Sequence, residues 1–309
     1  MTQVKIRSLN ISEEKGTLKT PVETVEINEL GMKGDAHAGH WNRQVSLLGI
    51  ESLKKAEEQN KLQFHYGDFG ENITTEGIEL HKCNVLDQFQ SGEVLLEVTQ
   101  IGKKCHSGCE IMQQVGNCIM PIEGTFCRVL KGGRITVGDE LTYIPKQIRI
   151  AVITLSDRAS KGIYEDKSGP LAAKLLKEFF EKGNRPVEIE MQVISDDEEK
   201  LKQLILHSIN DKTDIIVTTG GTGIGSRDIT PDVVKKLMDK EIPGIMELIR
   251  YKYGSQKPNV LLSRSVAGTI KESLIYTLPG SVKAVNEYLT EITGTLEHSL
   301  RMINDLDSH

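Results

Sequence analysis

A glycine-rich stretch at residues 220–228 has the composition of a loop that binds phosphate. It reads Gly-Gly-Thr-Gly-Ile-Gly-Ser-Arg-Asp and follows a predicted strand at 214–219. Thr230-Pro231 then opens a predicted helix, because proline is favoured at the first helical position. Backbone N–H groups in such a loop converge on an anion, and the helix start adds partial positive charge. The stretch lacks the Gly-Lys-Ser/Thr ending of a Walker A motif, so a phosphate loop and a plain glycine-rich turn both remain open.

Polar residues also follow three other predicted strands, at 149–155, at 187–194 and beginning near Ser273. Strands that alternate with helices form a parallel sheet, whose carboxyl ends open on one edge where ligands bind. Each Asp or Ser taken singly is explained by the capping of a helix, but their joint occurrence favours a ligand site. The residues expected at this edge are Ser156, Asp157, Asp196, Pro279, Gly280 and Ser281.

All five cysteines lie in the first half of the chain. An odd number of cysteines speaks against a disulfide framework and leaves thiol chemistry, metal binding or a buried apolar role. A structural zinc site or a redox pair is one alternative for Cys105, His106, Cys109 and Cys118, although Cys-x-x-x-Cys is looser than the usual zinc spacing.

Residues 34–43 combine two histidines, the only tryptophan and an arginine ahead of a predicted helix at 46–60. This mixture suits the recognition of an anionic or aromatic ligand. A loop around a buried tryptophan is the simpler alternative.

Two domains are expected for a chain of 309 residues. The boundary is placed at Pro145, because residues 138–140 are typical of a turn and a new buried strand follows. Short glycine-bounded runs of β-forming residues at 92–99 and 133–138 predict that residues 1–145 form a mostly β domain, a closed or half-closed barrel.

Residues 148–309 show alternating strands and helices. Apolar residues recur on one face at 168–182, and a second helix is predicted at 196–210, where Asp196 and Glu199 make a plausible capping pair. This order predicts a mainly parallel sheet covered by helices on both sides.

The net charge of −6 argues against a broad basic surface for nucleic acid, so small molecules and proteins are the expected partners. No stretch of about 18 apolar residues is long enough to span a membrane, and no signal peptide precedes the first strand. A cytoplasmic protein is therefore expected.

Several motifs of the second half keep the order and spacing of one known family. They are Ser156-Asp157-Arg158-Ala159-Ser160, residues 218–223, Arg227-Asp228, Thr230-Pro231-Asp232, Leu262-Ser263-Arg264 and Leu278-Pro279-Gly280. Together they resemble the molybdopterin adenylyltransferase family over residues 148–309. The resemblance implies a three-layer α/β fold that usually trimerises. It also implies that ATP and molybdopterin give adenylated molybdopterin and pyrophosphate, with magnesium.

The resemblance also implies roles for single residues. Asp228 and Asp196 correspond to aspartates implicated in catalysis, with Asp228 as a ligand of Mg²⁺. A carboxylate-held Mg²⁺ offsets repulsion between anionic reactants while backbone amides fix their geometry. Because Asp196 and Asp197 are adjacent, a shift of one residue would exchange the catalytic and capping roles. The pterin and nucleotide contacts implied are Ser156, Asp157, Gly220, Gly221, Thr222, Gly223, Ser263, Arg264, Pro279, Gly280 and Ser281.

Motifs of the first half, at 34–48, 67–75, 102–109 and 116–124, resemble the MOSC domain, the sulfurase C-terminal type of module. In that family the cysteine of a Gly-x-Cys-x-Met-Pro motif is thought to carry sulfur or ligate molybdenum, and here that position is Cys118. A thiolate is nucleophilic and soft, which suits either task. Cys83 and Cys127 are interpreted as small buried apolar residues.

The two resemblances together predict a fusion protein of molybdenum-cofactor biosynthesis. The second domain would bind molybdopterin and adenylate it with Mg-ATP, and the first would handle sulfur or the molybdenum cofactor. Expected partners are pterin and nucleotide molecules, other proteins of cofactor biosynthesis, and further copies of the chain, with a trimer favoured through the second domain. Three alternatives stay open: a carrier that binds the cofactor without adenylation, a cofactor-dependent reductase of N-hydroxylated compounds, and a nucleotide-binding enzyme of an unrelated pathway.

Overall fold

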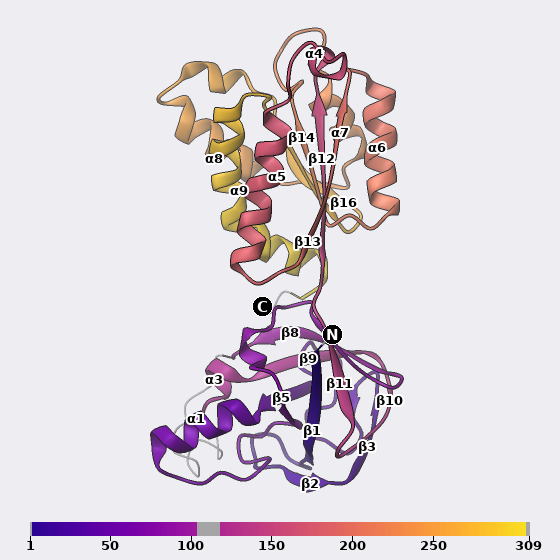
Figure 1. Cartoon of the computed structure of the whole chain (residues 1–309), viewed down its shortest axis with the longest axis vertical. Coiled ribbons are helices and arrows are strands. Elements are labelled where there is room, and N and C mark those ends of the chain that lie inside the picture. The colour runs from indigo at the N-terminus through magenta and orange to yellow at the C-terminus, as the bar shows by residue number, and fades with distance from the viewer. Residues whose placement is uncertain (1, 104–117, 307–309) are drawn as a thin grey trace. The chain divides into compact units, whose positions relative to one another are not determined.

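The computed structural model describes residues 2–103 and 118–306 (Figure 1). Their contacts divide the chain into two compact units, of which the first ends at Lys146 and the second begins at Gln147. No helix in the described ranges has the length and apolar composition that crossing a bilayer requires.

The first unit is mostly β. Its elements are β1 (Thr2–Ile11), β2 (Thr20–Val22), β3 (Thr24–Asn28), β4 (Gly31–Met32), β5 (Val45–Gly49), α1 (Ile50–Asn60), β6 (Ile73–Glu76), η1 (Leu80–Lys82), β7 (Gln88–Ser91), β8 (Val94–Ile101), α3 (Met120–Glu123), β9 (Thr125–Lys131), β10 (Gly133–Thr136) and β11 (Glu140–Ile144).

Seven strands of the described first unit close a barrel in the order β1, β11, β7, β8, β9, β5 and β6, and β6 pairs again with β1. All neighbours are antiparallel except β5 and β6. Strand β2 extends the sheet beside the end of β1, and β10, β3 and β4 form a second small sheet. Apolar side chains such as Ile6, Leu47 and Phe89 fill the core. Closure leaves no free edge among the barrel strands, and the predicted barrel is confirmed.

The predicted helix at 46–60 is wrong over its first residues, which belong to β5. Every residue of β5 is buried, and Leu47 pairs with Ile73 of β6 on one side and Thr125 of β9 on the other. A short apolar run that is buried on both faces fits a central strand as well as a helix, and pairing with two neighbours decides for the strand. Helix α1 begins only at Ile50.

The second unit alternates strands and helices. Its elements are β12 (Ile148–Leu155), α4 (Asp157–Ser160), α5 (Ser168–Lys182), β13 (Val187–Ile194), α6 (Glu198–Asn210), β14 (Ile215–Thr219), α7 (Thr230–Leu237), β15 (Lys240–Glu241), α8 (Pro243–Gly254), η2 (Pro258–Leu262), β16 (Ala267–Ile270), β17 (Ser273–Leu278) and α9 (Val282–Ile303).

Within residues 147–306, six strands form one sheet in the order β13, β12, β14, β17, β16 and β15. The first four run parallel, whereas β16 is antiparallel to both β17 and β15. Only Lys271 and Glu272 join β16 to β17, a link too short for the crossover that a parallel pair needs. The expected three-layer fold with a mainly parallel sheet is thus confirmed in part, because the sheet is mixed.

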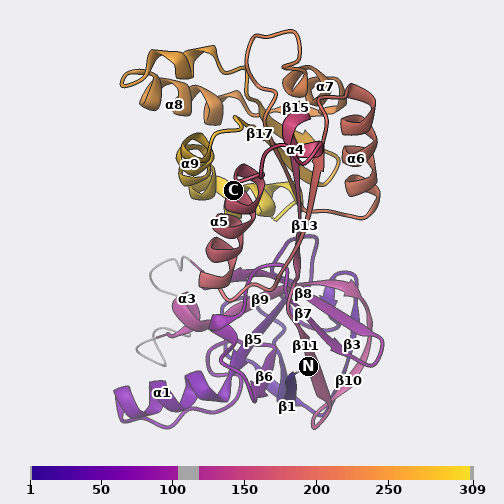
Figure 2. The ribbon, with the colours of Figure 1, turned by 45° about the horizontal axis from the view of Figure 1, so that its top comes forward.

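Helices cover both faces of this sheet (Figures 1 and 2). One face packs against α5, α8 and α9 through residues such as Leu176, Ile249 and Ile292. The other packs against α6 and α7 through residues such as Ile205 and Val234. With both faces buried, the carboxyl edge of the parallel strands is the place left for a ligand.

Candidate functional site

The carboxyl ends of the four parallel strands meet at one edge of the sheet. Thr219 at the end of β14 pairs with Thr154 of β12 and with Leu278 of β17. The backbone N–H of Gly220 donates to the carbonyl of Leu278 at 2.9 Å. A Cβ on Gly280 would lie 3.3 Å from the Cα of Gly220. The glycine loop and the Pro279-Gly280 turn, 59 positions apart, are therefore in contact, at the shared sheet edge on which the sequence predicted both to open.

The glycine loop begins with a turn that only glycine allows. Gly220 and Gly221 have φ values of +95° and +63°, in the left-handed region. A Cβ on Gly220 would lie 2.3 Å from the carbonyl oxygen of Leu155, and one on Gly221 would lie 2.5 Å from the Oγ1 of Thr230. The loop is thus pressed against the ends of β12 and α7.

The carbonyls of this loop face the protein and leave its amides available. The N–H of Thr230 donates to the carbonyl of Gly221 at 3.1 Å, and the N–H of Arg264 donates to that of Thr222 at 2.8 Å. In the part of the chain that the structure describes, the N–H groups of Gly221, Thr222 and Gly223 have no protein acceptor. Successive amides without acceptors are the feature that phosphate-binding loops share.

A cavity of about 760 Å³ opens beside these amides. Its walls come from the loop, from the segment after α8 and from the start of α9. Residues predicted at the site line it: Gly221, Thr222, Gly223, Asp228, Ser263, Pro279, Gly280 and Ser281. Lining residues that sequence reasoning missed are Gln256, Lys257, Pro258, Asn259, Val260, Leu262, Ala284 and Tyr288. Residues 256–260 carry no motif, and their nearness to the predicted Ser263 was the one available signal.

Three carboxylates crowd the sheet edge. The Asp228 Oδ2 accepts the N–H of Gly225 at 2.8 Å, and the Asp157 Oδ1 accepts the N–H of Asp196 at 3.2 Å. Burial, with the nearby charges of Asp157 and Asp228, raises the pKa of the Asp196 carboxyl. The guanidinium of Arg227 lies 3.1 Å from the Asp157 Oδ2 and offsets part of this negative charge. Asp228 lines the cavity, whereas Asp157 and Asp196 are not among its lining residues.

The adjacent aspartates at the end of β13 have different roles. The side chain of Asp197 caps α6 by accepting the N–H of Lys200 at 3.0 Å. The predicted capping pair of Asp196 and Glu199 is therefore wrong, because α6 begins at Glu198 and its N-cap is Asp197. Asp196 is the aspartate whose carboxyl is buried near the charge of Asp157 and, with a smaller effect, that of Asp228.

Two predicted serines cap helices. The hydroxyl of Ser156 accepts an N–H in the first turn of α4, and that of Ser281 accepts one in the first turn of α9, each at 3.2 Å. Ser156 does not line the cavity, so capping accounts for it, while Ser281 both caps α9 and lines the cavity. The Ser263 hydroxyl accepts from the hydroxyl of Tyr288 at 3.1 Å.

Arg264 supports the loop from outside the cavity. Its Nε donates to the carbonyl of Gly223 at 2.7 Å, and its Nη1 lies 2.8 and 2.9 Å from the two oxygens of Asp232. Its Nη2 also donates to the carbonyl of Asp228. The guanidinium therefore fixes the loop that carries the amides, and it does not line the cavity where a ligand contact was predicted.

Among the described residues, no three His, Cys, Asp or Glu side chains gather closely enough to hold a metal ion by themselves. Mg²⁺ commonly uses one or two carboxylates together with substrate phosphates and water. Asp228, which lines the cavity, fits that smaller donor set, and a cation there would offset the negative charge of Asp228, which together with burial and the charge of Asp157 raises the pKa of Asp196.

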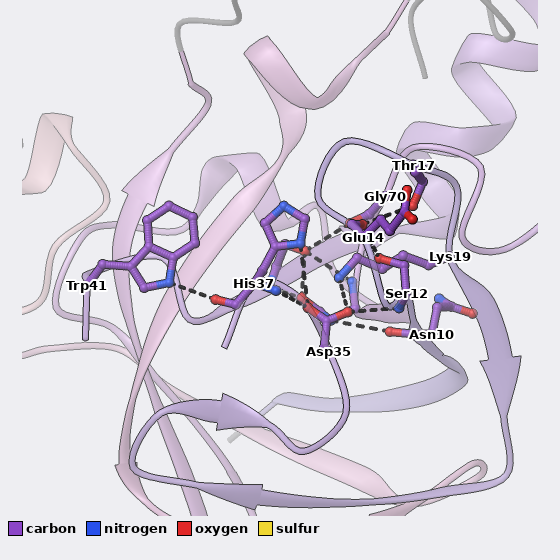
Figure 3. Close-up of polar contacts among 11 residues, drawn as sticks. Asn10, Ser12, Glu14, Thr17, Lys19, Asp35, His37, Trp41 and Gly70 are labelled. Atoms are coloured by element: carbon purple, nitrogen blue, oxygen red, sulfur yellow. Dashed lines mark hydrogen bonds and ion pairs between the residues drawn. The ribbon is translucent and has the colours of Figure 1, made fainter. Parts of the chain in front are cut away.

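In the first unit, residues 34–43 are anchored by a buried ion pair between Lys19 and Asp35 (Figure 3). The Asp35 carboxylate also accepts the N–H of His37 at 3.0 Å and that of Ser12 at 3.1 Å. Burial alone would raise the pKa of Asp35, but its hydrogen bonds with His37 and Lys19 outweigh burial and hold the pKa well below the usual range.

Trp41 follows this anchor, and its Nε1 donates to the carbonyl of His37 at 2.8 Å (Figure 3). The Nζ of Lys15 and the guanidinium carbon of Arg43 lie 5.5 and 5.0 Å from the indole centre. The ring is half-buried. The ring and its two cations are the groups on which the predicted recognition of an anionic or aromatic ligand depends, and that recognition stays a prediction.

Cys118 is half-buried and packs against an apolar cluster that includes Phe69 and Phe126. Cys105, His106 and Cys109, proposed as zinc or redox partners of Cys118, lie outside the described residues. Burial raises the pKa of the Cys83 thiol to about 12 and that of Cys127 well above its ordinary value. These two thiols stay protonated, in line with a buried apolar role.

Comparison with known families finds two matches. The family described as "Probable molybdopterin binding domain" matches residues 134–298, more than half of the chain. The MOSC domain matches residues 34–142.

Among similar proteins, the molybdopterin adenylyltransferase of Helicobacter pylori strain J99 is 36% identical over 157 residues, covering 50% of this chain and 88% of that protein. The molybdopterin adenylyltransferase of Escherichia coli K12 is 35% identical over 143 residues, covering 46% of this chain and 72% of that protein. A solved structure, the tungsten cofactor synthesizing protein MoaB of Pyrococcus furiosus, is 35% identical with a TM-score of 0.47, covering 52% of this chain and 98% of that one. The chain belongs to the probable molybdopterin binding domain family and carries a MOSC domain in its first half.

Proposed function

We propose that the second unit adenylates molybdopterin, using ATP and Mg²⁺, and releases pyrophosphate. The observation that carries the proposal is the cavity in which the amides of Gly221, Thr222 and Gly223, which lack an acceptor among the described residues, lie beside the carboxylate of Asp228. The curated relatives that share about a third of their residues with this chain are named for the same reaction.

In the proposed reaction an oxygen of the pterin phosphate attacks the α-phosphorus of ATP. A phosphorus–oxygen bond forms there, and the bond to the leaving pyrophosphate breaks. The phosphate nucleophile is already ionised near neutral pH, so neither Asp228 nor Asp196 needs to remove a proton. The protein contributes mainly position, because bringing two anionic groups together in a fixed geometry is the costly step.

Each part of the loop has a task in this proposal. The amides of Gly221, Thr222 and Gly223 bind phosphate oxygens without a rearrangement, because the left-handed turn and Arg264 already hold them in place. The hydroxyl of Ser263 lies in the same cavity as a further donor. Magnesium held by Asp228, with Asp196 nearby, would neutralise charge on the reacting phosphates.

For the first unit, we propose that Cys118 carries sulfur or ligates molybdenum of the finished cofactor. The MOSC match and the half-buried thiol support the choice of this cysteine over Cys83 and Cys127, whose thiols are held protonated. Residues 34–43, with Trp41 and its two neighbouring cations, would recognise the anionic cofactor.

Pyrophosphate release from Mg-ATP with added molybdopterin tests the second-unit proposal. We expect Asp228→Asn to lose most of the activity and Cys118→Ala to keep it. Asp211→Asn is the matched control, because Asp211 is an exposed residue at the far end of α6. A chain that binds molybdopterin and releases no pyrophosphate would be a carrier, and equal rates for wild type and Asp228→Asn would remove that residue from the mechanism.

A further inference from the structure

Two lysines share one carboxylate at the end of the cavity that lies next to α9. Lys257 lines the cavity, and its Nζ lies 3.4 Å from the Oε1 of Glu287. The Nζ of Lys283, one helical turn before Glu287, lies 3.9 Å from the same oxygen. In the ion pairs that the structure describes, both ammonium groups share this single carboxylate, which leaves one positive charge in excess.

The effect of this crowding appears on Lys283. The neighbouring Lys257 lowers the pKa of Lys283, as expected when two like charges lie close together, while the pKa of Lys257 is raised by its contact with Lys283 and by the carboxylate of Glu287, so that Lys257 holds its charge. Both lysine side chains are substantially exposed, whereas Glu287 is mostly buried beneath them. An anionic group placed against Lys257 would relieve the repulsion.

The cavity therefore has two regions suited to anions. One is the row of amides from Gly221 to Gly223, and the other is the lysine pair. Between them the wall is mixed, with apolar residues such as Val260, Leu262 and Ala284 beside polar ones such as Asn259 and Tyr288. The substrates proposed above carry several phosphate groups, so a second cationic region in the same cavity has a phosphate to bind.

We infer that Lys257, with Lys283 beside it on Glu287, binds a second anionic group of the substrates, apart from the phosphate at the glycine loop. The ligand chemistry is a phosphate oxygen, from a nucleotide or from a pterin phosphate. Lysine binds such a group as a mobile point charge, which suits a ligand that changes from triphosphate to pyrophosphate during the reaction. The inference rests on the function proposed for this cavity.

Direct binding tests it without turnover. Wild type, Lys257→Met, Lys257→Arg and Lys252→Met would be titrated calorimetrically with inorganic pyrophosphate, with Mg-ATP and with molybdopterin. Lys252 is the matched control, because it also pairs with a carboxylate of α9, that of Glu291, and does not line the cavity. Unchanged unfolding curves for all variants would show that the fold is intact.

We expect Lys257→Met to weaken binding of at least one phosphate ligand about tenfold and to flatten its dependence on salt. Lys257→Arg should restore most of the affinity, and Lys252→Met should bind as wild type does. An effect confined to molybdopterin would assign the site to the pterin phosphate, and one confined to ATP and pyrophosphate would assign it to the nucleotide. Equal affinities of wild type and Lys257→Met for all three ligands would overturn the inference. If the wild type binds the three ligands but releases no pyrophosphate from Mg-ATP, only the proposed adenylation would be overturned.

Discussion

Replacing Gly221 with alanine should destabilise the second unit by a calculable amount. A non-glycine residue at φ +63° costs about 1 kcal/mol. The new Cβ would lie 2.5 Å from the Oγ1 of Thr230, so that hydroxyl must move and lose its 2.9 Å hydrogen bond to the carbonyl of Gly220. A lost hydrogen bond costs about 1 kcal/mol more. The free energy of unfolding should therefore fall by about 2 kcal/mol from the two effects together.

A second substitution separates these two contributions. Thr230→Ala alone should cost about 1 kcal/mol, since it removes the same hydrogen bond. In Gly221→Ala/Thr230→Ala the clashing oxygen is gone and the hydrogen bond is lost only once, so the double variant should cost about 2 and not about 3 kcal/mol. Once the clashing Oγ1 is removed, the nearest atom to the new methyl group is the Cβ of residue 230 at 3.5 Å, which is an ordinary van der Waals contact.

The assay is urea unfolding followed by far-UV circular dichroism, which reports mainly the helices of the second unit. Gly244→Ala is the control, because Gly244 lies in α8 and a methyl group there would meet nothing within 4 Å, so this change should stabilise the helix slightly. Strictly additive costs in the double variant, or a Gly221→Ala protein as stable as wild type, would refute the described packing of the loop against α7.

Three further outcomes follow from the charges and thiols. Asp35→Asn should lower the free energy of unfolding of the first unit by about 3 to 5 kcal/mol, because it leaves Lys19 buried without its partner. Unfolding followed by the fluorescence of the single tryptophan would show this loss, and an unchanged midpoint would contradict it. The pKa of Asp196 is raised in the folded chain, so the folded state binds more protons than the unfolded state between the usual carboxyl pKa of about 3.9 and the folded value. The free energy of unfolding should therefore fall as the pH rises through this window. Asp196→Asn should remove this part of the pH dependence. Cys83 should react with an aromatic disulfide reagent only after the protein unfolds, because its thiol is buried and protonated. Peptide mapping of the labelled protein would establish this, and rapid labelling of Cys83 in the folded chain would show that the thiol is accessible.

The sequence predicted those parts of the fold that depend on local periodicity. The helix at 168–182 and the strand at 187–194 appear with the predicted bounds, because the spacing of apolar residues in each segment favours only one type of element. Strand β5 was missed because its apolar run is too short to distinguish a helix from a strand. The antiparallel edge of the second sheet depends on the pairing of β16 with β17, and strand direction is not encoded in hydrophobic pattern.

The same division applies to the site. Gly221 and Asp228 could be placed at the sheet edge, because a glycine-rich loop follows a predicted strand there and the family resemblance singled out Asp228. Lys257 was not, because it reaches the cavity only through the position of the segment after α8. The roles of Asp228, Asp196 and Cys118, the expected trimer and the cytoplasmic location stay predictions.

The charges around the sheet edge suggest why the free chain carries unfavourable interactions there. Carboxylates crowd near Asp228, and ammonium groups crowd near Lys257, so each region repels itself when no ligand is bound. A cation relieves the first region and a phosphate relieves the second, and Mg-ATP carries both charges. Repulsion that ligand binding removes lowers the stability of the free protein but increases its affinity for a ligand of matching charge. If the lysine pair takes a nucleotide phosphate, the two crowded regions would together favour Mg-ATP over either component alone, which is the selectivity that the proposed adenylation requires.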